Sequence, residues 1–253
     1  MEYFVTHDSI VRKIWGKGDT ILFIFAGASA EFALNKAVDW LYYTGKLPAD
    51  PLKRLFSTIT YARQIVFSEK EAALDAIDKI TAIHQTVEKN RGALIPDWAY
   101  RDVLFMLIHY SIASFEVMER KLSANEKEDV YEVFKRLGTR MNLKELPLTF
   151  DAWKESRQSH LEQNLFKSKY SIDLYRQYRK HLGFSRYKIL LEAQVLVVPA
   201  VVKKLLNLGN ISWLQPLLSI YKFTRILKLD WFFKSIILPK DYRSRVKDLD
   251  THP

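Results

Sequence analysis

Apolar residues recur along the chain with a spacing of three or four positions, and long stretches of strict alternation are missing. The first pattern places apolar side chains on one face of a helix, whereas alternation is typical of a half-buried strand. We therefore expect an all-α protein. The predicted helices span residues 9–15, 20–44, 51–67, 69–91, 96–122, 126–141, 150–167 and 172–182, with several more between 187 and 233.

Local signals support several of these helix ends. Serine is followed three residues later by glutamate at 68–71 and at 123–126, and both stretches have the form of a capping box at the start of a helix. Glycine often ends a helix because it adopts left-handed backbone angles without strain. Periodic segments end near Gly92, Gly138 and Gly183. The stretch 44–51 is expected to be a loop.

No long linker divides the chain, since it has no Gly-, Ser- or Pro-rich tract, low-complexity segment or repeat. Its 253 residues, 48% of them hydrophobic, can bury a sizeable core as a single domain. Charge nonetheless separates two segments: residues 1–164 carry 22 Lys and Arg against 23 Asp and Glu, whereas residues 165–253 carry 17 against 6. We expect a helical core over 1–164 and a basic, aromatic-rich helical extension over 165–253 that packs on the same domain.

The basic extension has the composition of a segment that binds a charged surface. Its aromatic and basic residues include Trp213, Trp231, Phe232 and Phe233 beside Lys222, Arg225, Lys228 and Lys234. Amphipathic helices of this composition lie on anionic membranes, and basic patches also bind nucleic acid. A solvated basic surface over a helical core is the remaining alternative. Because no nucleic-acid-binding module accompanies the charge, we expect no nucleic-acid partner and keep an anionic membrane surface as the candidate.

Neither a membrane span nor a secretion signal is expected. The longest uncharged stretch, 205–221, contains Asn, Gly, Gln and Pro, which disfavour a bilayer-spanning helix. The amino terminus mixes acidic and basic residues and lacks a cleavage-like pattern. We therefore expect a cytoplasmic location, peripheral to a membrane if the basic extension binds one.

Missing motifs exclude several common chemistries. The chain has no cysteine, and therefore no disulfide, thiolate metal site or cysteine nucleophile. It also lacks the P-loop, the glycine pattern of dinucleotide-binding folds and the nucleophile elbow of hydrolases. No histidine follows a glutamate by three positions, and no His-Glu-x-x-His occurs, so a metal site built wholly from side chains is weakly supported.

His84 is the first candidate site residue. On the predicted helix 69–91, apolar residues such as Ile77 and Ile80 share its face, so the His84 side chain is expected to face the core. A histidine on an apolar face is either a hydrogen-bonded core residue or a ligand. His109 lies within an uncharged run and has the same two interpretations.

Arg54 is the second candidate site residue. It lies four positions before Thr58 and seven before Tyr61, so a cation and two hydroxyls share a helix face that would otherwise be buried. A buried charge needs a partner. That partner is either a carboxylate, such as Asp39 or Glu31, or the acid groups of a bound cofactor.

Several short motifs follow one another along the first half of the chain. In order they are Trp15-Gly with Asp19, Arg54-Leu-Phe-Ser-Thr58, Tyr61, Phe67, His84-Gln-Thr-Val87, Ser111 and Phe115 on a long apolar helix, Leu122-Ser-x-x-Glu126, Tyr131 and Leu146-Pro147. This order resembles the MpaB/rubber oxygenase (latex-clearing protein) family, and the resemblance covers residues 15 to 153. Each motif is short, and their shared order across several helices carries the resemblance.

The resemblance implies a globin-like core of long helices and haem b as cofactor. It makes His84 the axial ligand of the iron and places Arg54, Thr58 and Tyr61 beside the haem. It also makes Arg54, Thr58 and Asp39 the candidate catalytic residues. The implied activity is that of an oxidoreductase, in which dioxygen cleaves a carbon–carbon double bond of a lipophilic isoprenoid-type substrate. The alternative is a non-catalytic, membrane-peripheral helical protein that retains the family fold.

Overall fold

Eleven helices and no strand make up the regular structure of residues 2–45 and 49–226, the part of the chain that the computed structural model describes. The expected all-α fold is confirmed. The helices are α1 (Ile10–Trp15), α2 (Gly18–Leu34), α3 (Val38–Tyr43), α5 (Pro51–Phe67), α6 (Lys70–Arg91), α7 (Asp97–Met118), α8 (Ala124–Arg140), α9 (Phe150–Gln163), α10 (Lys169–Val197), α11 (Ala200–Leu206) and α12 (Leu214–Ile226).

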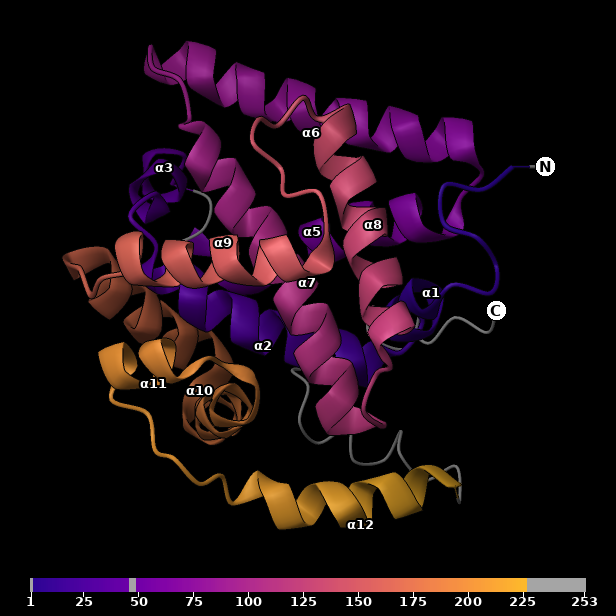
Figure 1. Cartoon of the computed structure of the whole chain (residues 1–253). Coiled ribbons are helices and arrows are strands. Elements are labelled where there is room, and N and C mark those ends of the chain that lie inside the picture. The colour runs from indigo at the N-terminus through magenta and orange to yellow at the C-terminus, as the bar shows by residue number, and fades with distance from the viewer. Residues whose placement is uncertain (1, 46–48, 227–253) are drawn as a thin grey trace.

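Helix α2 lies at the centre of the fold (Figure 1). It packs most extensively against α7 and then against α10, while α5 and α6 form a second packed pair. The contact between α2 and α7 requires a glycine, because a Cβ atom at Gly27 would lie 2.2 Å from Cδ1 of Tyr110. The two helices therefore approach more closely than any larger residue at position 27 would permit.

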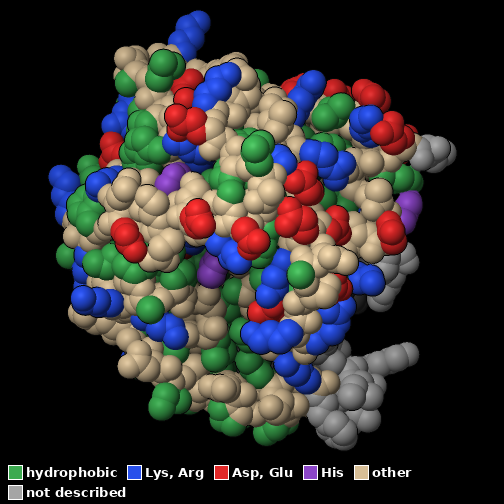
Figure 2. Space-filling view, in the orientation of Figure 1, with side chains coloured by type: hydrophobic (Ala, Val, Ile, Leu, Met, Phe, Trp, Pro, Cys, Tyr) green, Lys and Arg blue, Asp and Glu red, His purple; other side chains and the backbone are tan. Residues whose placement is uncertain are grey.

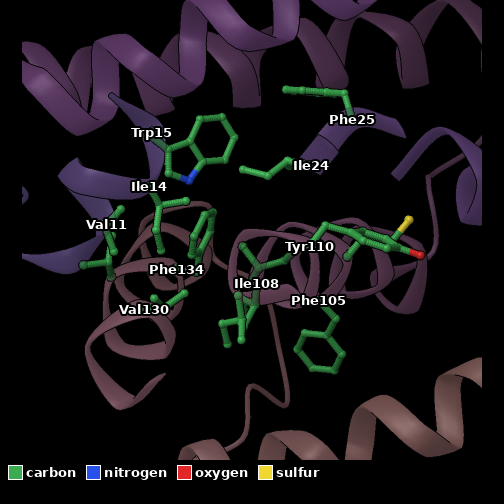
Figure 3. Close-up of a cluster of buried hydrophobic side chains, with 14 of the residues drawn as sticks. Val11, Ile14, Trp15, Ile24, Phe25, Phe105, Ile108, Tyr110, Val130 and Phe134 are labelled. Carbon is green, nitrogen blue, oxygen red and sulfur yellow. The ribbon is translucent and has the colours of Figure 1, made fainter. Parts of the chain in front are cut away.

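Large apolar side chains from α1, α2, α7 and α8 fill the space around this contact (Figure 3). Trp15, Ile24 and Ile108 are fully buried there. The indole Nε1–H of Trp15 donates to Oγ of Ser111 at 3.2 Å, so the polar atom of this buried ring is satisfied. This core fixes α1, α2 and α7 relative to one another.

The single helix predicted over 20–44 is wrong, because α2 ends at Leu34 and α3 begins at Val38. Asn35 has extended backbone angles between them. Its side chain accepts a hydrogen bond from the Ala37 amide at 2.8 Å and donates one to Asp102 on α7 at 2.7 Å. Bonds to a helix far away in sequence therefore end α2, and helical periodicity does not reveal them.

Four other helix-end predictions have mixed outcomes. The capping box at Ser123 is confirmed, but Ser68 ends α5, and α6 starts at Lys70 without a side-chain cap. Gly183 interrupts α10 with a positive φ of 73°. Gly138 lies inside α8 instead of ending it, and a Cβ there would lie 2.7 Å from Cδ2 of Leu104, so this glycine serves helix packing.

Part of the basic extension joins the helical body. Helices α10 and α11 both contact α2, whereas α12 contacts α10 and lies along one side of the molecule (Figure 1). The residues Lys228, Trp231, Phe232, Phe233 and Lys234, the Arg225 side chain and residues 46–48 of the predicted loop lie outside the described residues. Within the described ranges, no helix is long and apolar enough to cross a membrane. The division of the chain after residue 164 stays a prediction.

One ion pair is almost wholly buried between α2 and α9. Both carboxylate oxygens of Glu31 accept hydrogen bonds from the Arg157 guanidinium, and Oε2 also accepts one from the Tyr110 hydroxyl at 2.8 Å. The side chains of Glu31 and Arg157 are 1% and 5% exposed. Burial, followed by the negative charge of Glu31, raises the pKa of Tyr110 far above its ordinary value, so Tyr110 stays a hydrogen-bond donor.

Removing the cation from this pair should destabilise the fold strongly. Arg157→Met leaves the Glu31 carboxylate buried without its counter-charge, and we expect the free energy of unfolding to fall by about 3–5 kcal/mol. Arg140→Met is the matched control, because Arg140 pairs with Asp78 at the surface, where solvent screens the charges, and its loss should destabilise the fold much less. Urea denaturation at pH 7 measures both, and equal losses would contradict the structural role of the buried pair.

Candidate functional site

A large apolar cavity lies among the helices. Its volume is about 930 Å³, and residues of α2, α3, α5, α6, α7, α8, α10 and α12 line it. Ligand sites in proteins are cavities of about 300–1,000 Å³ with mostly apolar walls and a few polar groups. Protein interiors are otherwise close-packed. A space of this size is therefore what a large lipophilic ligand or prosthetic group requires.

His84 projects into this cavity from α6. The C-terminal part of that helix is defined by Gly92, which ends it with left-handed backbone angles and a φ of 69°. Within the described residues, neither ring nitrogen of His84 has a hydrogen bond, and Nδ1 is buried. Burial, and then the charge of Arg54, lowers the pKa of His84 to about 4. His84 is thus neutral at pH 7, which is the form of imidazole that binds metals.

Burial alone does not single out His84, because His109 and His181 also have a buried ring nitrogen without a partner. His109 differs in its surroundings: burial and the charge of Arg157 lower its pKa to about 3, and it interacts with the Val197 backbone. Of these three histidines, only His84 lines the large cavity. Position on the cavity wall therefore distinguishes it.

Arg54 enters the same cavity from α5. This helix begins where the sequence predicts, because Pro51 occupies its first turn and the Asp50 carboxylate accepts a hydrogen bond from the Lys53 amide at 2.9 Å. Nη1 of Arg54 donates to Oγ1 of Thr58 at 2.9 Å. The Thr58 hydroxyl in turn donates to the Arg54 carbonyl at 3.1 Å. Thr58 thus fixes the orientation of the guanidinium.

Arg54 forms no ion pair with any described residue. Of the two carboxylates considered from the sequence, Glu31 binds Arg157, and Asp39 pairs with Arg91 at 2.7 Å. Burial lowers the pKa of Arg54. The charge of Arg54 is therefore compensated by neither candidate, and the alternative of a ligand's acid groups gains support.

The structure brings four of the predicted site residues together, namely His84, Arg54, Thr58 and Tyr61, all on the wall of one cavity. Asp39 is not among the lining residues. It is held on α3 by Arg91, whose guanidinium also lies 3.9 Å from the centroid of the Trp40 ring. The neighbours Trp40 and Leu41 do line the cavity, so this ion pair fixes the position of α3 on the wall. The roles predicted for all five residues stay predictions.

Arg186 is a cavity residue that the sequence analysis did not single out. It lies on α10, lines the cavity, and has a buried Nε without a partner among the described residues. It shares its helix face with apolar wall residues such as Leu182, Ile189 and Leu190. An arginine within an apolar stripe is the same signal that marked Arg54. The stripe around Arg186 is hard to recognise in the sequence because it begins next to Gly183, where the helix is interrupted.

The helices thus surround a large apolar cavity, and the described residues of its wall include a neutral histidine and two arginines. The sequence model of the family described as the catalytic domain of the ER-bound oxygenases MpaB and MpaB′ and of rubber oxygenase matches residues 13–219. The chain belongs to this oxygenase family. No curated protein matches the chain. The match extends beyond residue 164 and includes α10, α11 and the first part of α12.

An uncompensated buried charge should not stabilise the protein in the absence of a ligand. For protein prepared without cofactor, we expect Arg54→Met to leave the free energy of unfolding unchanged or to raise it by about 1 kcal/mol. Arg91→Met, which removes a paired cation that also lies over Trp40, should instead lower it by about 1 kcal/mol. Urea denaturation compares the two. A loss of several kcal/mol in Arg54→Met would contradict the absence of a compensating carboxylate.

Proposed function

We propose that the protein is a haem-b-dependent oxygenase that cleaves a carbon–carbon double bond in a lipophilic, isoprenoid-type substrate. The observation that carries the proposal is the neutral His84 on the wall of an apolar cavity that also holds Arg54. Among the described residues, no group forms a hydrogen bond to His84 and no carboxylate pairs with Arg54. Membership of an oxygenase family supports the reaction class. The substrate class rests on the resemblance and on the apolar wall.

The residues of the cavity fit haem b. Haem is a flat apolar macrocycle with an iron that takes an imidazole ligand and with two carboxylate side chains. His84 supplies an imidazole in the required neutral form. Arg54 and Arg186 supply two cations that pair with no described carboxylate, and charge-assisted hydrogen bonds to carboxylates are the strong interactions of arginine. Thr58 and Tyr61 add hydroxyls beside Arg54.

Haem, when bound, supplies the iron chemistry by which such proteins use dioxygen. The chain's own residues bind, orient and exclude water. His84 would hold the iron, Arg54 oriented by Thr58 would hold an acid group, and the apolar walls would orient the hydrocarbon chain of the substrate and keep water out. For Asp39 the ion pair with Arg91 supports a positioning role on α3, and its catalytic role stays a prediction.

A visible absorption spectrum tests this proposal directly. Protein produced with adequate haem supply should show a Soret band, and His84→Ala should abolish or strongly shift that band because the iron would lose the imidazole that holds it. His109→Ala and His181→Ala are matched controls, since both remove a histidine with an unpartnered buried nitrogen from outside the cavity. An unchanged Soret band in His84→Ala would refute the ligand assignment.

The second candidate function, a non-catalytic protein on a membrane surface, also has a structural observation in its favour. Apolar side chains are exposed on and just before α12, with Ile211 86%, Trp213 49% and Ile220 58% exposed. Figure 2 shows hydrophobic side chains at the edge of the molecule formed by α12, at the bottom of the view. Such side chains, near basic residues, are typical of helices that lie on anionic lipid. An anionic membrane surface is thus compatible with both functions.

Vesicle flotation tests the membrane surface. We expect binding to anionic vesicles that weakens with salt, and at least tenfold weaker binding for Trp213→Ser combined with Ile220→Ser, because each side chain loses its apolar transfer energy. Phe184→Ser is the control, since Phe184 is 63% exposed on α10. Equal effects of both changes, or no binding by the unaltered chain, would contradict this partner.

A further inference from the structure

A second cavity lies on the other side of α12. Its volume is about 400 Å³. In contrast to the large cavity, most of its lining side chains are polar, namely Lys203, Asn210, Ser212, Gln215, Ser219 and Lys222. We call this the polar pocket. It does not overlap with the haem-site residues His84, Arg54 and Thr58, which line only the large cavity.

The charge in the polar pocket has one sign. Lys203 comes from α11 and Lys222 from α12, both are half-buried, and no carboxylate of the described residues lines the pocket. Neither lysine forms an ion pair with a described residue. Two ammonium groups that converge on one polar pocket without a counter-ion are best compensated by an anion, and lysine binds phosphate as a point charge.

The neutral groups of the polar pocket can also serve an anion. Ser212 is 1% exposed. Its Oγ accepts a hydrogen bond from the Leu214 amide at 3.1 Å, which leaves the hydroxyl hydrogen available for an acceptor. The pocket also contains Gln215, in the first turn of α12, where backbone N–H groups and the helix dipole favour negative charge. Every type of group on the polar wall can donate a hydrogen bond.

Two different faces of helix α12 line the two cavities. Leu214, Leu217 and Tyr221 line the large apolar cavity, whereas Gln215, Ser219 and Lys222, which follow at intervals of four and three, line the polar pocket. Leu218 lines both. Leu218 therefore lies between the two cavities, with apolar walls on one side of it and cationic walls on the other.

We propose that the polar pocket binds the phosphate or diphosphate head of an amphiphile whose hydrocarbon tail lies in the large cavity. The proposal rests on the proposed function in that it takes the large cavity as the substrate site. The substrate is then a prenyl-type chain with an anionic head, and the pocket between α11 and α12 selects for that head. Lys203 and Lys222 are the residues that determine this specificity.

Titration calorimetry on the full chain tests the proposal without measuring turnover. The probes are octyl phosphate, decyl phosphate and the neutral octyl glucoside, each below the concentration at which it forms micelles. We expect octyl phosphate to bind at least tenfold more tightly than octyl glucoside. Decyl phosphate should bind roughly fifteenfold more tightly than octyl phosphate, since each of the two added methylenes that enter an apolar cavity contributes roughly fourfold. Affinity that is independent of chain length or of head charge would overturn the proposal.

The variants assign the effect to the pocket. Lys203→Gln combined with Lys222→Gln should weaken the binding of decyl phosphate at least tenfold and leave that of octyl glucoside unchanged, which also shows that the large cavity is intact. Lys204→Gln is the matched control, because Lys204 is the exposed neighbour of Lys203 on α11 and does not line the pocket. It should alter affinity by less than twofold. Equal losses in the double variant and the control would overturn the proposal.

Vesicle binding is a second measurement, which distinguishes a pocket for a single amphiphile from a surface that binds the headgroups of a bilayer. The double variant should bind vesicles of phosphatidic acid and phosphatidylcholine as the unaltered chain does, and should lose only the soluble phosphates. Loss of vesicle binding without loss of decyl phosphate binding would assign the two lysines to the membrane surface and overturn the pocket. Because the assay needs no haem, a missing Soret band would refute the proposed function and leave this measurement decisive on its own.

Discussion

An unpaired buried charge is costly, and the ion pair between Glu31 and Arg157 is the buried pair on which the other charged groups depend. That pair joins α2 to α9 and uses both oxygens of Glu31, which is one of the two carboxylates considered as partners of Arg54. Asp39 is likewise committed to Arg91. As a result, Arg54 faces the large cavity without either candidate carboxylate. The cost of an unpaired buried charge therefore explains two features together: the ion pair that stabilises the fold, and an arginine on the cavity wall that can bind an acid group of a ligand.

The polar groups around the cavities are sorted by kind. A neutral histidine and the arginines of α5 and α10 lie on the large apolar cavity, while lysines and small donors lie on the polar pocket. Arginine offers a planar fork that matches a carboxylate, and lysine offers a compact charge that suits phosphate. Helix α12 lies between the large cavity and the polar pocket, because one of its faces lines the first and another face lines the second. In the proposed function, α12 would therefore lie between the cavity for cofactor and hydrocarbon and the pocket for the head group.

Most helices could be predicted from the sequence because their apolar stripes and end signals are local. The capping box of α8 and the left-handed Gly92 are examples in which neighbouring residues alone fix a helix end. The break after Leu34 could not be predicted, since it depends on the bond from Asn35 to Asp102 across the fold. The role of Gly138 could not be predicted either, because a Cβ atom there would collide with Leu104 on another helix.

For the candidate site, helical periodicity in the sequence is enough to predict which side chains share a face. The intervals between Arg54, Thr58 and Tyr61 fix one wall of α5, and the apolar stripe of α6 fixes the direction of His84. The packing of distant helices sets which carboxylate pairs with which arginine. It also places Arg186 on the wall of the same cavity and Asp39 outside that wall. Helical periodicity is a property of a few turns, whereas ion pairing and cavity walls depend on how distant helices pack.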